Sequence, residues 1–297
     1  MNKVVSRKIN KVLEVPEERI QMLDSQLASI DSDIAVSLSF VRRAQGLTFS
    51  DLEQRTSGLK GSTLKRYMQQ SYHSMRPIHV VAALSWVMMV PMTSFYYALK
   101  VGEYYRGMDK NAIKVLYCIG RLPTEQFELY LQIVANLMTQ EAKEQFQQYH
   151  SQLLSTIDLP NSYEELLPPS VLDVNEFAID YYRSAAITVK RFRLENNISI
   201  ELMARVLGLS DYQYMVLEDV NKVRDFSVAI GFRVKLGLHL DSHASFTSEM
   251  QQFPQFHQLR QFQHVRDSLV VEALRQLTPK HKQNAVQILT SLSRNYT

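Results

Sequence analysis

A scarcity of turn-forming residues is the feature that most constrains how this chain can fold. Its 297 residues include only nine glycines and nine prolines, too few for the many tight turns of a β-sandwich or β-barrel. Apolar residues recur instead at helical spacing, for example at Ile34, Leu38 and Val41 and again through residues 129–137. No segment shows a convincing strand alternation. The sequence therefore predicts an all-α fold.

Composition narrows the class of protein and its environment. Hydrophobic residues make up 45% of the chain and charged residues 21%, as in a globular protein. The single cysteine, Cys118, has no intramolecular disulfide partner, and the basic start of the sequence is not followed by an apolar run. The longest apolar stretch, residues 78–92, is shorter than the roughly 20 residues that span a bilayer. We therefore expect a cytoplasmic protein with no membrane contact.

Two pairs of segments repeat at a similar offset along the chain. Residues 46–67 match residues 197–217 in pattern, with Ser57 as one extra residue, and residues 121–137 match residues 276–292. The offset is near 150 residues in both cases. Helical segments can resemble each other by chance, but two matches in the same order and at a common offset favour an internal duplication.

The first repeated segment contains a compact helical motif. Residues 34–70 hold three short helical patterns, which cannot be stable alone and must share one core. Thr48 is placed to cap the second of these helices, with Asp51 in its first turn, and Gly58 supplies a tight turn before a helix at residues 61–70. This arrangement is a helix-turn-helix, a motif whose second helix enters the major groove of DNA.

On these residues the chain resembles the Cro/CI-type (XRE, lambda-repressor-like) helix-turn-helix family, and it resembles it twice, at residues 42–92 and 193–240. The resemblance implies about five helices in each domain and a sequence-specific transcriptional regulator that binds DNA. One departure is Phe49, which stands where the family often has Gln. We therefore predict two lambda-repressor-like helix-turn-helix bundles, each followed by an amphipathic helix and related by internal duplication.

The predicted order of domains combines these motifs with a proline-rich linker. It consists of an N-terminal helical arm (1–33), a first, DNA-reading helix-turn-helix domain (34–100), a helical extension (101–158), a linker and connecting helix (159–183), a second, degenerate helix-turn-helix domain (184–242), a Gln- and Phe-rich loop (243–264) and a C-terminal helix (265–297).

The resemblance also assigns roles to individual side chains. Leu64 takes the buried position of the recognition helix, so the residues predicted to contact bases are those that face outward: Lys60, Gly61, Ser62, Lys65, Arg66 and Gln69. The residues predicted to contact phosphates lie before the recognition helix: Arg42, Arg43, Thr48, Ser50 and Arg55. Because one short recognition helix reads only a few base pairs, we expect a homodimer on double-stranded DNA.

Charge distinguishes the two motifs. Residues 34–76 contain seven basic and two acidic residues, whereas residues 187–225 contain six of each. The second recognition helix begins with Asp211, offers no cation and exposes Tyr212, Gln213 and Met215. Because phosphate neutralisation supplies most of the non-specific affinity for DNA, we expect only the first motif to bind DNA. Tyr212 and Met215 are expected to form a partner interface instead.

Other patterns bear on alternative functions. Three aromatic pairs are expected to fill the core: Tyr96-Tyr97, Tyr104-Tyr105 and Tyr181-Tyr182. His239 and His243 have a spacing that suits zinc, with Asp241 between them, but a third ligand is missing, so neither a metal nor another cofactor is expected. The sequence contains none of the common catalytic motifs, and no enzyme is predicted. The alternative is a protein-interaction adaptor or antitoxin-like factor whose helix-turn-helix domains bind protein.

Overall fold

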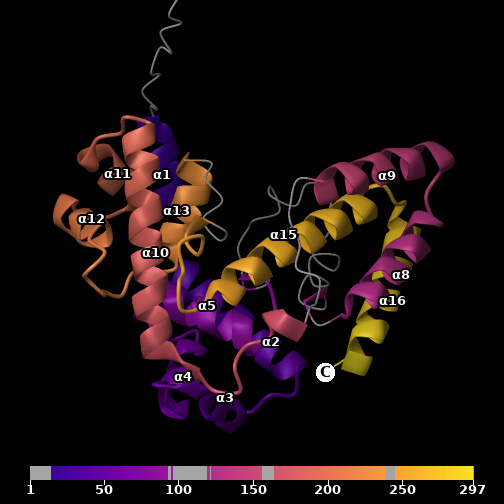
Figure 1. Cartoon of the computed structure of the whole chain (residues 1–297), viewed down its shortest axis with the longest axis horizontal. Helices are drawn as coiled ribbons and strands as arrows, with labels where there is room; N and C mark the ends of the chain where they lie inside the picture. The colour runs from indigo at the N-terminus through magenta and orange to yellow at the C-terminus, as the bar shows by residue number, and fades with distance from the viewer. Residues whose placement is uncertain are drawn as a thin grey trace, which may run out of the picture.

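A computed structural model of the chain describes residues 15–92, 95, 119–120, 122–155, 164–238 and 245–296. The secondary structure in these residues is almost entirely helical, and both strands are only two residues long, which confirms the predicted all-α class. Figure 1 shows two arms of helices joined by one long helix, α15. Among the helices in these ranges, none has the length and hydropathy needed to cross a membrane.

The first helix-turn-helix motif lies among the first five helices, which are α1 (Glu17–Gln26), α2 (Ile30–Ala44), α3 (Phe49–Arg55), α4 (Gly61–Tyr67) and α5 (Ile78–Val87). The Thr48 hydroxyl accepts the backbone N–H of Asp51, and the Asp51 carboxylate accepts the N–H of Thr48, which confirms the predicted cap. Gly58 has a φ of +90° at the predicted turn, and Leu64 is fully buried. The recognition helix ends at Tyr67 rather than at residue 70.

A second set of four helices repeats this order, with α10 (Val174–Glu195), α11 (Ile200–Leu207), α12 (Asp211–Leu217) and α13 (Ala229–Leu238). Ser199 caps α11 as Thr48 caps α3. The preceding helices end at equivalent residues with positive φ, +68° at Gly46 and +52° at Asn197. Gly208, with a φ of +67°, supplies the turn before α12. The two motifs therefore share element order and local backbone geometry.

The two motifs also share one core. α10 packs along α5, and a single cluster of buried apolar side chains runs through both units. The strands β1 (Thr56–Ser57) and β2 (Leu172–Asp173) pair in parallel and join the end of α3 to the start of α10. Tyr181 and Tyr182 of α10 are buried, as predicted. The predicted boundaries at residues 33/34 and 183/184 fall inside α2 and α10 and need correction, because each of these helices is one continuous element.

A long helix replaces much of the predicted Gln- and Phe-rich loop (243–264). α15 (Pro254–Arg275) begins at a proline, which is tolerated in the first turn of a helix. Phe256, Leu259 and Phe262 are buried at a spacing of three residues. The expectation of a loop is therefore wrong from residue 254 onward, because burial of this apolar face outweighs the polar glutamines between its members. The helix also continues across the predicted boundary at 264/265.

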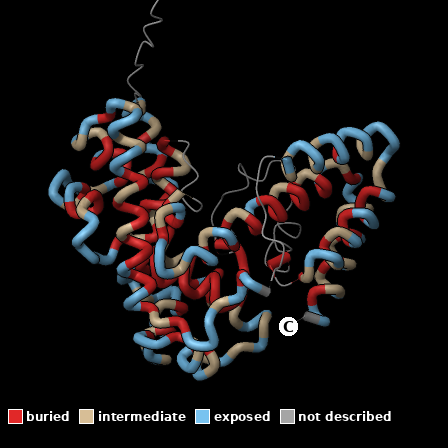
Figure 2. Tube along the Cα trace, viewed as in Figure 1, coloured by how far each residue is buried: buried red, intermediate tan, exposed pale blue. Residues whose placement is uncertain are grey.

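A second apolar core lies in the other arm. There α8 (Thr124–Ala135), α9 (Gln140–Ser155) and α16 (Pro279–Ser293) pack with the second half of α15. α8 and α16 correspond to the two amphipathic segments that the sequence repeat predicts. Figure 2 shows α9 largely exposed, and Phe146 is its one buried residue. Two 3₁₀ helices, Glu164–Leu166 and Arg294–Tyr296, complete the described structure.

Some expectations concern residues outside the described ranges. They are the cysteine, two of the aromatic pairs and the histidines with zinc-like spacing: Cys118, Tyr96-Tyr97, Tyr104-Tyr105, His239, Asp241 and His243.

Candidate nucleic-acid interface

The predicted reading surface is built on a buried contact between α3 and α4. Leu52 of α3 and Leu64 of α4 are fully buried in the shared core. Figure 1 shows both helices beside the N-terminal end of α10. The burial of Leu64 turns the neighbouring positions outward, and five of the six residues predicted to contact bases are exposed: Lys60, Ser62, Lys65, Arg66 and Gln69.

The cations on this surface form no ion pair with the carboxylates in the described ranges. Lys60 and Lys65 form no ion pair with any residue in the described ranges. The Arg66 guanidinium lies 6.0 Å from the ring centroid of Tyr72. Arg55 is half-buried at the end of α3, where burial lowers the pKa of its guanidinium without any described carboxylate beside it. These groups give α3 and α4 a positive surface that attracts anions.

Arg42 has a structural role next to this surface. Its Nη1 donates a hydrogen bond of 2.5 Å to the Leu47 carbonyl oxygen, and its guanidinium lies 4.3 Å from the ring centroid of Phe49. Partial burial, and to a lesser degree the neighbouring Arg43, lower the pKa of Arg42. The Phe49 ring thus packs against the Arg42 guanidinium. Arg43 is exposed and donates to the Ser39 carbonyl oxygen at 3.2 Å.

A carboxylate of α3, that of Glu53, lies beside the start of α4, and the sequence did not predict this proximity. A Cβ atom at position 61 would lie 2.7 Å from Oε2 of Glu53. Gly61 therefore faces α3 rather than the outer surface, unlike the other residues predicted to contact bases. Glu53 itself is exposed. No pattern in the sequence shows this proximity, because it depends on the turn between the two helices.

The two hydroxyl residues predicted to contact phosphates differ in availability. The Thr48 hydroxyl donates to Oδ2 of Asp51 at 2.8 Å and accepts the N–H of Asp51, so it is already used in the cap. The hydrogen bond from the Thr48 backbone N–H, and to a lesser degree that from its hydroxyl, lower the pKa of the Asp51 carboxyl. Ser50 is exposed in the first turn of α3 and has no partner among the described residues. Of the two hydroxyls, Ser50 is the one that remains available to an external acceptor.

Arg76 corrects the charge argument made from the sequence. It is 1% exposed, although it was counted among the seven basic residues of the first motif. Its guanidinium donates to four carbonyl oxygens in and after α4, at 3.2, 2.7, 2.5 and 2.8 Å: those of Tyr67, Gln69, Tyr72 and Ser74. Its backbone N–H donates to Asp31 at 2.6 Å. Arg76 thus shapes the turn that follows the recognition helix and adds no charge to the surface.

In the second motif the equivalent arginine is paired with a carboxylate instead of a backbone carbonyl oxygen. Arg193, the equivalent of Arg42, forms two hydrogen bonds with the Glu218 carboxylate, at 2.6 and 2.9 Å. The Tyr214 hydroxyl donates to the same carboxylate at 2.5 Å. Burial alone would raise the pKa of Glu218, but the hydrogen bonds from Arg193 and Tyr214 hold it below its usual value. The cation at this position is therefore neutralised inside the unit.

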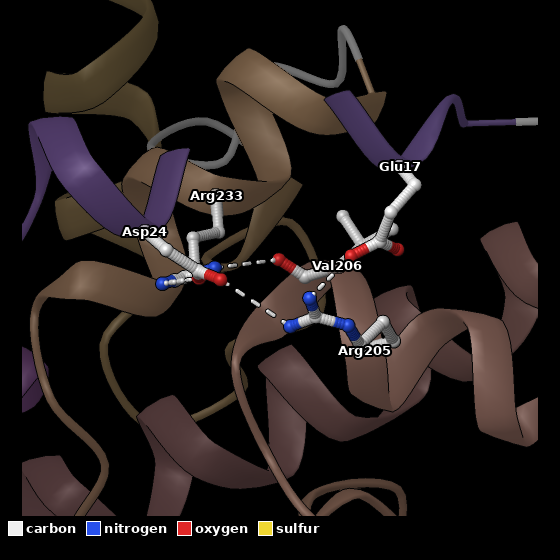
Figure 3. Close-up of polar contacts among 5 residues, drawn as sticks. All are labelled: Glu17, Asp24, Arg205, Val206 and Arg233. Atoms are coloured by element: carbon white, nitrogen blue, oxygen red, sulfur yellow. Dashed lines mark hydrogen bonds and ion pairs between the residues drawn. The ribbon is translucent and has the colours of Figure 1, made fainter. Parts of the chain in front are cut away.

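Figure 3 shows two further arginines of the second unit, on α11 and α13, that are paired with carboxylates of α1. Arg205 of α11 pairs with Glu17 at 2.5 Å and with Asp24 at 3.3 Å. Arg233 of α13 pairs with Asp24 at 2.6 Å and donates to the Val206 carbonyl oxygen at 3.3 Å. The hydrogen bond from Arg233 lowers the pKa of Asp24. These contacts fasten α1 to α11 and α13 and leave α11 and α12 without an unpaired cation.

The outer face of α12 is apolar and acidic. Tyr212 is 63% exposed and Met215 is 49% exposed, in agreement with the exposure predicted for both. Asp211 is also exposed on α12, and Glu201 is exposed on the neighbouring helix α11. The predicted exposure of Gln213 is wrong, because Gln213 is half-buried and its side chain completes a capping box with Ser210. α4 is therefore cationic and α12 apolar and acidic on their outer faces, although the two helices occupy equivalent places in the two units.

No group of three or more His, Cys, Asp or Glu side chains in the described ranges is placed to hold a metal ion. Comparison of the chain with models of known protein families, with curated proteins and with solved structures found no match.

Proposed function

We propose that this protein is a sequence-specific transcriptional regulator that binds duplex DNA, with α4 in the major groove. The observation that carries the proposal is the set of exposed, unpaired cations on α4, Lys60, Lys65 and Arg66, next to Ser62 and Gln69. A helix presented in this way suits the width of the major groove. Its cations would neutralise phosphates or donate to guanine O6 and N7.

The first step of the test is to select bound duplexes from random DNA and to measure affinity for the selected sequence by fluorescence anisotropy. The double variant Lys65→Ala, Arg66→Ala is then compared with the unmodified protein. Base-edge contacts contribute about 1 to 3 kcal/mol each, so we expect a loss of about tenfold or more on the selected sequence and a smaller loss on random duplex.

The matched control removes the same charge from the other arm, with Lys143→Ala at a half-buried position of α9 and Lys280→Ala at an exposed position of α16. It should leave DNA affinity nearly unchanged. Equal losses on both duplexes in the α4 variant would reassign Lys65 and Arg66 to phosphate contacts. A protein that selects no duplex would contradict the proposal itself.

A second candidate function rests on α12. Four apolar side chains are exposed on α12 and the segment after it: Tyr212, Met215, Val220 and Val223. Exposed aromatic and Met side chains are typical of protein interfaces. We therefore propose, as the alternative, that α12 binds a protein partner, either a second copy of the chain in the predicted homodimer or an adaptor target.

This alternative makes a separate prediction. Replacing Tyr212 and Met215 with Glu should lower the molar mass measured by light scattering if α12 forms the homodimer interface. DNA affinity per chain should persist, because neither residue lies on α4. An unchanged mass in this variant would exclude α12 as the dimer interface.

A further inference from the structure

The two helix-turn-helix units meet through contacts that remain the same when the units are exchanged. After Ser57, a residue of the first unit corresponds to the residue 150 positions later in the second. The N–H of Ile78 donates to the carbonyl of Phe226 at 2.9 Å, and the N–H of Val228 donates to the carbonyl of Arg76 at 3.0 Å. Pro77 and Ser227, which correspond to each other, form the antiparallel bridge at the centre. Reciprocal pairing of this kind is the signature of a two-fold axis.

The helices around this bridge follow the same reciprocal rule. α10 packs on α5, and α1 packs on the equivalent helix α13. The end of α3 meets the start of α10 through β1 and β2. In the same way, the end of α11 meets the start of α1, where Arg205 pairs with Glu17 (Figure 3). α1 and α2 together thus take the place in the first unit that the single helix α10 takes in the second.

The second core contains another contact between residues that correspond in a sequence repeat. The hydroxyl of Tyr130 in α8 donates to the carbonyl of Ala285 in α16 at 3.3 Å. These residues are 155 positions apart, as are Leu122 and Leu277 in the sequence repeat. α8 and α16 therefore also contact each other through corresponding residues.

The interface between the units is buried and polar contacts fix it. The Tyr182 hydroxyl accepts the N–H of Phe226 at 3.0 Å and lies 3.0 Å from Nδ1 of His79, so it joins α10, α5 and the segment before α13. His79 and Tyr182 are both buried. The position of α12 relative to α4 is therefore set within one chain.

We infer that one chain forms the two-fold pair of helix-turn-helix units that a homodimer was expected to supply, and that its target is an asymmetric duplex site bound by a single chain. This inference rests on the proposed DNA-binding function. Only the half of the site that faces α4 is read. The other half faces α12, which contains no cation, and there Asp211 and Glu201 present like charge to phosphates.

Stoichiometry provides the first test. On a selected duplex long enough for two half-sites, native mass spectrometry should find one chain per duplex, and a hydroxyl-radical footprint should protect one half-site strongly. Two chains with a symmetric footprint would overturn the inference and leave the DNA-binding function in place. Failure to bind any selected duplex would overturn the function and the inference together.

The second test is a graft that transfers exposed residues of α4 to the equivalent positions of α12. It asks whether the two-fold axis within the chain coincides with a two-fold axis of duplex DNA. The variant Asp211→Asn, Tyr212→Ser, Met215→Lys gives the exposed face of α12 the Ser and Lys that α4 has at positions 62 and 65. We expect it to bind an inverted repeat of the selected half-site, at one spacing, about tenfold or more tightly than a single half-site. The unmodified protein should show no such preference.

The control for the graft is Asp211→Asn, Tyr212→Ser, Met215→Ala, which lacks the added cation. All three positions are exposed, and thermal melting of both variants reports whether the fold is kept. If no spacing of the inverted repeat gives the graft a gain over the control, the internal axis does not match the axis of DNA and the inference is wrong.

Discussion

The two helix-turn-helix units have similar backbones, but they differ in whether their cations are paired with carboxylates. The caps at the start of α3 and α11, the glycine turns and the buried positions are the same in kind, although α12 begins with a capping box and α4 has no side-chain cap. In the first unit Lys60, Lys65 and Arg66 stand unpaired on the surface, whereas in the second unit Arg193 and Arg205 are paired with carboxylates. The comparison shows that the shared backbone places a short helix at the surface of each unit. The exposed side chains of that helix then determine whether its outer face is cationic or acidic.

One pair of equivalent residues shows how the difference arises. Arg42 and Arg193 precede the same helix end, and the carbonyl of each accepts a hydrogen bond from the residue five positions later. Position 218 is Glu, while its equivalent in the first unit is Met68. Arg193 therefore has a buried carboxylate partner, and Arg42 lies against Phe49 and the Leu47 carbonyl instead.

The largest expected effect comes from breaking the Arg193–Glu218 pair. Arg193→Ala leaves the mostly buried Glu218 carboxylate without its cation, and such losses cost about 3 to 5 kcal/mol. Arg42→Ala removes one hydrogen bond and a ring contact and should cost about 1 to 2 kcal/mol. Urea denaturation measures both free energies of unfolding. Replacing both Arg193 and Glu218 with Met should recover much of the loss, and similar costs for Arg42→Ala and Arg193→Ala would contradict the contrast.

The contact between the units should make stability depend on pH. Burial lowers the pKa of His79 to about 4, although nearby Asp225 opposes the shift. The unfolded chain takes up this proton near pH 6.5 and the folded chain does not, so stability is complete above pH 6.5 and falls as the pH drops toward 4. The loss is about 3 kcal/mol.

The measurement is the free energy of unfolding of the unmodified protein and of His79→Gln between pH 7 and pH 4. Their difference isolates the titration of the His79 imidazole from that of the carboxyl groups in the same pH range. If the two proteins lose stability in parallel, His79 does not hold the interface as a neutral ring.

Local chemistry explains which parts of the fold were predictable. The cap at Thr48, the turn at Gly58 and the buried Leu64 depend on residues within one or two helical turns, and all three were predicted. The start of α15 depends on distant groups instead, because the Asp180 carboxylate of α10 accepts the N–H groups of residues 251, 252 and 253. No spacing in the sequence shows that long-range contact, so the helix that follows was taken for a loop.

The candidate site divides in the same way. Exposure of Lys65 and Arg66 follows from helical geometry once Leu64 is known to be buried. Burial of Arg76 does not follow from the sequence, because four carbonyl oxygens from a turn solvate its guanidinium. The proximity of Glu53 to Gly61 was missed for the same reason, since the two residues belong to different helices and meet only through the fold.

The smallest expected effect tests whether the acid at the start of α4 opposes DNA. Glu53→Gln removes one negative charge beside Gly61 without changing the size of the side chain, so affinity for duplex should rise by about two- to fivefold at low salt and less at high salt. Glu201→Gln makes the same change on α11, where no unpaired cation faces the phosphates, and should have a smaller effect. Anisotropy titrations at several salt concentrations compare the two variants. Equal gains would mean that phosphates approach both units equally, and the asymmetry between α4 and α12 would then have to be given up.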